Sequence, residues 1–150
     1  MKLSPHFTLE ELTQSETATR HGISNQPGPG EMDNLVRLAD ELEQVRSLLG
    51  DLPVLISSGY RSPGVNRLVG GAANSDHMSG RAADFICPGF GTPLQVCRAI
   101  SQSPIRFEQL IMEGTWTHFS VPALDAGARR QVLTAHFSSN GRVTYTPGLA

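Results

Sequence analysis

One eleven-residue stretch, SDHMSGRAADF, restricts the fold of this chain more than any other. Its aspartate, Asp84, follows two alanines and precedes a phenylalanine, in a run that is typical of a half-buried β-strand. Side chains alternate along a strand, so Asp84 shares one face with Ala82 and Ile86. An unpaired charge on such a face costs several kcal/mol, so a positive partner must lie against it.

The partner of Asp84 is either an arginine or a metal ion. His77 lies seven positions earlier, and neither a continuous helix nor a continuous strand would bring the two side chains to one ion. A turn would, and Ser79-Gly80 supplies the residue that turns most readily. The segment is therefore expected to run from a loop that carries His77 into a strand that carries Asp84.

A second histidine favours the metal. In WTHFSV the side chains of Trp116, His118 and Ser120 alternate with their neighbours, so one strand face presents an imidazole beside an indole. Two histidines and one carboxylate are a common catalytic zinc set, which leaves a fourth position for water. His77, Asp84 and His118 are therefore the candidate ligands. The three other histidines are expected to be satisfied core residues: His6, His21 and His136.

Helical patterns come first in the chain and short strand patterns cluster later. Helices are expected from about Leu9, over 31–49, from Ser62 to Gly70-Gly71 and over 91–102. Strands are expected at 54–57, 82–86, 107–112 and 116–121, followed by a C-terminal hairpin over 131–146 that turns at Asn140-Gly141. This order predicts an α+β fold over residues 1–150, as one domain with a central, mainly antiparallel sheet flanked by helices.

The length, net charge and apolar content of the chain limit its fold and its binding partners. A chain of 150 residues, 39% of them hydrophobic, can bury a sizeable core in one domain without disulfides. The net charge of −2 argues against nucleic acid as a partner, and no apolar run approaches the length of a membrane span. The N-terminus lacks the apolar core of a signal peptide, so the protein is expected to be cytoplasmic at synthesis. A monomer is favoured.

Three motifs together resemble one family. In their order and spacing, SGYRSPGVN, SDHMSGRAADF and WTHFS are similar to the zinc D-Ala-D-Ala carboxypeptidases and related phage endolysins of the M15 peptidase family, which share a fold with Hedgehog signalling domains. The resemblance covers roughly residues 7 to 121. It implies that His77, Asp84 and His118 hold one Zn²⁺ per chain. It also implies that Arg61 and Ser75 bind a carboxylate or carbonyl of the substrate, and a guanidinium fork suits a carboxylate.

The general base is where the sequence departs from the best-known members of that family. They place an acid two or three positions before the last histidine, and this chain has none there. The nearest acid is Glu113, five positions before His118. In an unbroken strand an odd spacing puts two side chains on opposite faces, so Glu113 reaches the site only if Gly114 permits a bend or bulge. Asp76, beside the first histidine, is the fallback.

The resemblance implies a zinc-dependent peptidase that hydrolyses peptidoglycan stem peptides. Either a D-Ala-D-Ala carboxypeptidase or an L-Ala-D-Glu endopeptidase is expected, with water activated by zinc and with Glu113 moving the proton. Trp116 would wall the pocket or contact the substrate, although a plain core aromatic is an equal alternative. If the protein belongs to phage lysis or to a virion, it acts on the cell wall.

Two alternatives to this enzyme remain open. One is a noncatalytic zinc-containing protein of the same fold, with a wall-binding or structural phage role. The other is a cysteine hydrolase, which is less favoured because Cys97 follows a helical core pattern and Cys87 stands in no nucleophile motif. Without a secretory signal, both cysteines are expected to be reduced core residues.

Overall fold

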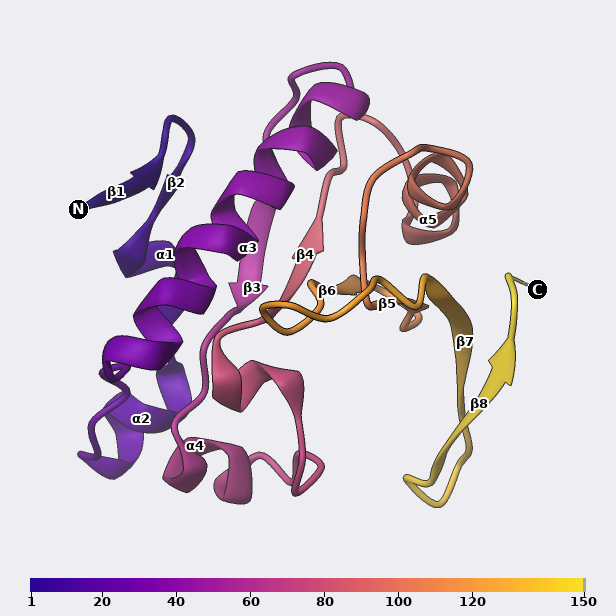
Figure 1. The fold of residues 1–150 in the computed structure, drawn as a ribbon. Coiled ribbons are helices and arrows are strands. Elements are labelled where there is room, and N and C mark those ends of the chain that lie inside the picture. The colour runs from indigo at the N-terminus through magenta and orange to yellow at the C-terminus, as the bar shows by residue number, and fades with distance from the viewer. Residues whose placement is uncertain (150) are drawn as a thin grey trace.

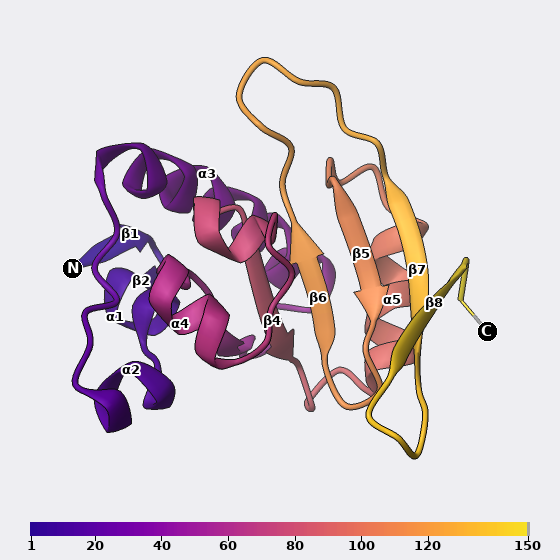
Figure 2. The same ribbon diagram turned by 90° about the horizontal axis from the view of Figure 1, so that it is seen from below.

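The computed structural model describes residues 1–149 and has one large sheet at its centre (Figure 1). The strands of this sheet are β3 (Leu55–Ser58), β4 (Ala82–Ile86), β5 (Gln109–Met112), β6 (Thr117–Ser120), β7 (Gln131–Phe137) and β8 (Val143–Pro147). Their spatial order is β3-β4-β6-β5-β7-β8, and Figure 2 shows β4 to β8 side by side in this order. All neighbours are antiparallel except β5 and β7, which run parallel. The predicted α+β class is confirmed.

The helices begin at caps that can be read from the sequence. They are α1 (Leu9–Thr13), α2 (Glu16–His21), α3 (Pro29–Leu48), α4 (Pro63–Leu68), α5 (Pro93–Ser101) and the short 3₁₀ turn η1 (Asp76–Ser79). Thr8 and Glu11 form the expected capping box of α1, and Thr92 caps α5 with proline at the first helical position. The sequence pattern did not separate α2 from α1. It also missed a small antiparallel pair, β1 (Lys2–Ser4) and β2 (Phe7–Thr8).

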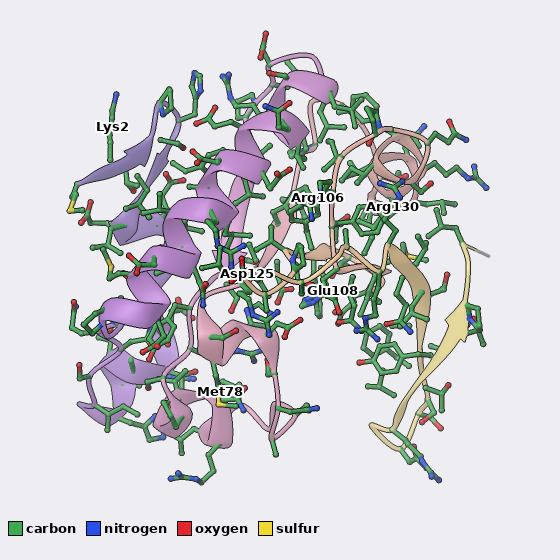
Figure 3. All side chains as sticks on the ribbon, in the orientation of Figure 1. Lys2, Met78, Arg106, Glu108, Asp125 and Arg130 are labelled. Atoms are coloured by element: carbon green, nitrogen blue, oxygen red, sulfur yellow. The ribbon has the colours of Figure 1, made fainter. Side chains whose placement is uncertain are left out.

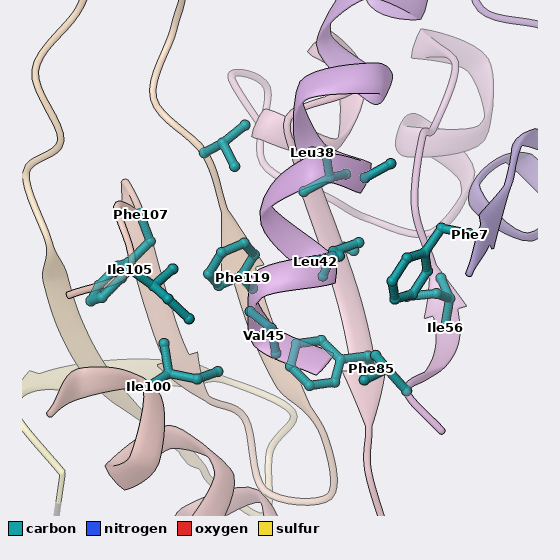
Figure 4. Close-up of a cluster of buried hydrophobic side chains, with 14 of the residues drawn as sticks. Phe7, Leu38, Leu42, Val45, Ile56, Phe85, Ile100, Ile105, Phe107 and Phe119 are labelled. Atoms are coloured by element: carbon teal, nitrogen blue, oxygen red, sulfur yellow. The ribbon is translucent and has the colours of Figure 1, made fainter. Parts of the chain in front are cut away.

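The core lies between α3, α5 and one face of the sheet. Helix α3 contributes a buried apolar stripe at helical spacing: Leu35, Leu38, Ala39, Leu42 and Val45. Figure 4 shows Leu38, Leu42 and Val45 close to Phe85 of β4 and Phe119 of β6. Each large side chain that is fully buried in this way contributes roughly 1.5–3 kcal/mol to folding.

The strand register places apolar side chains on one face of the sheet and polar side chains on the other. Ala83 lies opposite Phe119, and both side chains belong to the core. One position along, Asp84 lies opposite His118, which in turn lies opposite Ile111 of β5. Because directly opposed residues point to the same side, these polar side chains share the face that α3 and α5 leave free. One face of the sheet therefore packs against the hydrophobic core, and the other face carries the polar side chains of Asp84 and His118.

The end of α1 packs directly on the chain that follows β3. The Tyr60 N–H donates to the Leu12 carbonyl at 2.7 Å. A Cβ atom on Gly59 would lie 2.4 Å from that same carbonyl oxygen, so only glycine permits the approach. The buried amide of Asn25 donates to the carbonyls of Thr13 and Tyr60 and so fixes the same junction.

Both cysteines, Cys87 and Cys97, are buried and unpaired. Among residues 1–149, no helix combines the length and the apolar character that a membrane crossing needs.

Candidate metal centre

Three side chains that are distant in sequence meet on the free face of the sheet. His77 comes from η1, Asp84 from β4 and His118 from β6, and their ligand atoms all lie within 4.8 Å of one another. The Asp84 Oδ1 atom is 3.4 Å from His77 Nε2 and 3.0 Å from His118 Nδ1. The trio that the sequence indicated is therefore assembled as a group that could hold a metal ion.

The turn that was expected between His77 and Asp84 lies at Gly80. This glycine has a φ of 78°, and its N–H donates to the His77 carbonyl at 3.3 Å. The chain therefore leaves η1 and enters β4 within a few residues. This geometry brings together two side chains that a continuous helix or strand would separate.

A backbone carbonyl sets the orientation of the His77 ring. The Nδ1 atom lies 2.7 Å from the Gly59 carbonyl oxygen, which only accepts hydrogen bonds, so Nδ1 carries the proton. In the neutral ring Nε2 then keeps its lone pair. This atom is buried and has no hydrogen-bond partner within residues 1–149. A lone pair and a carboxylate oxygen 3.4 Å apart repel each other unless a cation lies between them, and the trio therefore fits a metal ion.

Electrostatics keeps Asp84 in its anionic form. Burial opposes the charge, but the hydrogen bond with His118 and the attraction of both imidazoles in their protonated form outweigh burial and hold the pKa of Asp84 well below its usual range. Burial also disfavours the imidazolium form of His118, yet the neighbouring Asp84 raises the pKa of His118 above its ordinary value. Two imidazoles and one anionic carboxylate form a donor set that suits zinc.

Glu113 reaches this site through a hairpin turn. Its N–H donates to the Trp116 carbonyl at 3.0 Å, and Gly114 between them has a φ of 77°. The strands β5 and β6 pair on either side of this turn, so Glu113, Trp116 and His118 point to one face. The Glu113 Oε1 atom lies 3.8 Å from His118 Nδ1, and burial raises the pKa of Glu113. The bend expected at Gly114 is thus a turn between two strands.

Asp76, the fallback acid, is already engaged. Its Oδ1 atom accepts a hydrogen bond from Arg81 Nη2 at 2.8 Å. Of the two acids considered as general base, Glu113 is therefore the one whose carboxylate lies beside the histidine cluster.

The trio lies in a cleft of about 530 Å³ that also contains Arg61, Ser75, Glu113 and Trp116. The chain from α4 to η1 forms one wall, and the β7–β8 hairpin forms the other; Figure 1 shows these two segments on opposite sides of the sheet centre. A larger hollow of about 1050 Å³ adjoins it and shares Arg61 and Val69, but none of the trio lines it.

Two polar groups in the cleft wall lack partners. Within residues 1–149 the buried Nε of Arg61 and the buried Nε1 of Trp116 make no hydrogen bond. The Nη2 of Arg61 donates to Ser75 Oγ at 3.5 Å. Burial lowers the pKa of Arg61, whereas the charges of Asp84 and Glu113 oppose that shift. Arg61 is a half-buried cation that lines the cleft, which is a suitable position for binding an anionic group.

The other three histidines lie outside this cluster, but the expectation that they are core residues is wrong. His6, His21 and His136 are exposed, and each is hydrogen-bonded: to Glu43 Oε1 at 2.8 Å, to the Thr17 carbonyl at 2.9 Å and to Thr146 Oγ1 at 2.8 Å. Polar partners at the surface satisfy these rings as well as a core would.

Part of the cleft was not predicted from the sequence. Arg129, Leu133 and Tyr145 line it, and all three follow the segment in which the site motifs lie. Alternation in QVLTAHF and RVTYT indicated a hairpin but did not indicate where it docks. The Gly59 carbonyl was also missed, because a backbone group leaves no signal in residue type.

Residues 5–120 match the peptidase M15 family. The chain belongs to this family. It is also similar to the zinc D-Ala-D-Ala carboxypeptidase of Streptomyces albus G, with 48% identity over 45 residues. That segment covers 30% of this chain and 18% of the Streptomyces protein, so the match spans less than a fifth of the relative. The predicted zinc cofactor agrees with this M15 relative and with the trio of possible ligands.

Proposed function

We propose that this M15 protein is a zinc metallopeptidase that hydrolyses peptidoglycan stem peptides. The observation that carries the proposal is the buried Nε2 of His77, which makes no hydrogen bond within residues 1–149 and lies 3.4 Å from Asp84 Oδ1, beside His118. A second carboxylate, Glu113, stands next to this set in the same cleft. Ligands for a metal and an adjacent acid are the parts that metal-assisted hydrolysis of a peptide needs.

A zinc ion bound by His77, Asp84 and His118 would lower the pKa of a water molecule and polarise the scissile carbonyl. Glu113 then acts as the general base. Burial raises the pKa of its carboxyl, which makes it a better proton acceptor than an ordinary surface glutamate. It takes a proton from the attacking water and returns it to the leaving amine.

Arg61 and Ser75 position the substrate. The guanidinium lies in the cleft wall, and its Nε makes no hydrogen bond to the described residues, so a substrate carboxylate can supply the missing acceptor. Ser75 Oγ, which accepts from the N–H of His77 at 3.2 Å, has a hydroxyl hydrogen to donate to a carbonyl. Trp116 walls the cleft between these groups and the hairpin.

The substrate class rests on two supports. The Streptomyces relative is named for action on D-Ala-D-Ala, a dipeptide with a free carboxylate. The Arg61 guanidinium, whose Nε makes no hydrogen bond within residues 1–149, suits such a C-terminus and therefore favours carboxypeptidase action. Endopeptidase action at L-Ala-D-Glu is the other product pattern to test, because it places an internal peptide in the same cleft.

The test follows zinc content and peptide cleavage in four proteins. Wild type, His118→Ala, Glu113→Gln and Glu41→Gln are loaded with zinc and given defined muropeptides. Glu41 is a matched control, because it is also a half-buried carboxyl whose pKa is raised by burial, and it lies outside the cleft. Released D-alanine and newly exposed amino groups identify the bond that is cut.

We expect wild type and Glu41→Gln to bind one zinc and to cleave. His118→Ala should lose the metal, and Glu113→Gln should keep the metal but lose turnover by roughly 100-fold or more. If wild type binds zinc but does not cleave, the proposed peptidase activity is refuted, and a noncatalytic wall-binding or structural protein of this fold is favoured.

A further inference from the structure

The β7–β8 hairpin presents an apolar face at the edge of the cleft. In the register of the two strands Ala135 lies opposite Tyr145 and Phe137 lies opposite Val143, so these side chains point to one side. Leu133 belongs to the same side, two positions from Ala135. We call this set the hairpin face: Leu133, Ala135, Phe137, Val143 and Tyr145. Phe137 and Tyr145 are 54% and 51% exposed, a large fraction for aromatic side chains.

The hairpin face continues the surface that carries the metal ligands. Leu133 lies opposite Ile111, and Ile111 lies opposite His118. A single row of side chains thus runs across β4, β6, β5 and β7, from Asp84 to Leu133. Leu133 and Tyr145 line the same cleft as Glu113 and Arg61. A peptide bound at the metal site would therefore lie against this face.

Aromatic and polar contacts fix the hairpin in this position. The rings of Trp116 and Phe137 are 6.3 Å apart, and a Cβ atom on Gly114 would lie 3.3 Å from the Phe137 ring. At the start of β7, Arg130 donates to the carbonyls of Ser101 and Ser103 at 2.9 and 3.1 Å. Figure 3 shows Arg130 between β7 and the end of α5. The hairpin is thus fastened at its entry and beside the active-site turn.

Tyr145 is near the charged groups of the site. Partial burial of the phenol raises its pKa, and the negative charges of Glu113 and Asp84 raise it further. The hydroxyl therefore stays protonated at neutral pH and is a hydrogen-bond donor beside an apolar ring. A peptide offers a carbonyl for the donor and an aliphatic side chain for the ring.

We propose that the hairpin face is the subsite that receives the apolar side chain of the substrate peptide, and that Tyr145 makes the specificity-determining contact. The occupant is the stem peptide itself, because the face is continuous with the metal site and its Leu133 and Tyr145 line the same cleft as Arg61. This inference rests on the proposed function. It extends that function to residues 131–147, which lie beyond the part of the chain that matches the M15 family.

The chain contains a built-in probe for this contact. Its single tryptophan, Trp116, lines the cleft and contacts Phe137, so fluorescence reports occupancy without requiring turnover. A synthetic stem peptide ending in D-Ala-D-Ala is titrated into zinc-loaded Glu113→Gln protein, in which cleavage is blocked. The same titration is made with Tyr145→Ala, Tyr145→Phe or Thr144→Ala added. Thr144 is the matched control, because it is exposed on the opposite side of β8.

We expect Tyr145→Ala to raise the peptide Kd by about tenfold, as truncation of an aromatic contact does, with zinc content and Tm unchanged. Tyr145→Phe keeps the ring and should recover most of the affinity, and Thr144→Ala should bind as the parent does. Equal Kd values for Tyr145→Ala and Thr144→Ala would overturn the proposal. So would a concentration-dependent dimer that Tyr145→Ala dissociates, because a second copy of the chain would then cover the face.

The two proposals fail in different ways. If the peptide binds and Tyr145→Ala lowers its affinity, but wild type cleaves nothing, the proposed peptidase activity is refuted and the proposed subsite is supported. If wild type cleaves and Tyr145→Ala has wild-type Kd and kcat/KM, the subsite is refuted and the enzyme stands.

Discussion

The imidazole Nδ1 of His77 lies 2.7 Å from the carbonyl oxygen of Gly59, and this bond selects the ring nitrogen that faces Asp84. Hydrogen bonds of this kind behind a ligand fix its tautomer and direction, and their loss typically weakens metal binding 10- to 100-fold. The strength of the metal site therefore depends on a backbone group that no substitution can remove but that a substitution can displace.

Gly59→Ala should displace it. The new Cβ would lie 2.4 Å from the Leu12 carbonyl oxygen, so the chain after β3 must shift. We expect a loss of about 1–3 kcal/mol in the free energy of unfolding and a zinc affinity lower by roughly 10- to 100-fold. Denaturant unfolding and zinc titration measure the two effects. Gly30→Ala is the control, since a Cβ there meets nothing within 4 Å; equal results for both variants would contradict the prediction.

Removal of the metal should lower thermal stability. A ligand at 100 times its Kd adds about 2.7 kcal/mol to the free energy of unfolding. We expect a chelator to lower the Tm of wild type and of His136→Ala, whose histidine is exposed and outside the trio. The chelator should leave the Tm of His118→Ala unchanged. A metal-dependent shift of full size in His118→Ala would place the ion elsewhere.

Arg61→Met should separate stability from activity. The guanidinium Nε is buried without a partner in the described residues, so its removal is not expected to lower the Tm. The loss of a charge-assisted contact to the substrate should lower kcat/KM by roughly 10- to 100-fold. Arg67→Met, on the exposed side of α4, should match wild type in both measurements. A steep fall in Tm together with unchanged kcat/KM would make Arg61 a structural residue.

The Cys97 thiol should be inert in the folded protein. It is fully buried, and burial raises its pKa from an ordinary 9.0 to about 11. The neutral thiol is favoured in the folded state, so its contribution to stability is present below pH 9.0 and is lost as the pH rises toward 11. At pH 8 we expect a thiol reagent to react only on unfolding. Comparison of wild type with Cys97→Ala between pH 8 and 11 isolates the pH-dependent part, and parallel curves would contradict the assignment.

The three candidate ligands could be predicted because each inference depended on interactions within a short segment of the sequence. The position of Asp84 in a strand pattern indicated a half-buried carboxylate that needs a cation. Gly80 indicated the turn that brings His77 beside it. His118 followed from alternation in one further strand. Each inference used only side-chain direction and the energy of a buried charge.

Pairing between distant strands could not be predicted in the same way. The pattern of β7 and β8 specifies a hairpin but not the parallel partner β5, which is reached only after a long connection. Glu113 raised the same difficulty on a smaller scale. In a single strand, its odd spacing from His118 would put the two side chains on opposite faces. Across a hairpin turn the same spacing can put them on one face, and the register of the hairpin determines which applies.

The contact between Leu12 and Tyr60 links the first helix to the metal through the adjacent Gly59 carbonyl. Such links are thermodynamically reciprocal, so whatever α1 contributes to ion affinity, the bound ion returns to the docking of α1. Undocking of residues 9–13 is therefore expected to weaken the metal site in the same event. Metal occupancy is consequently expected to report on whether the first helix is docked.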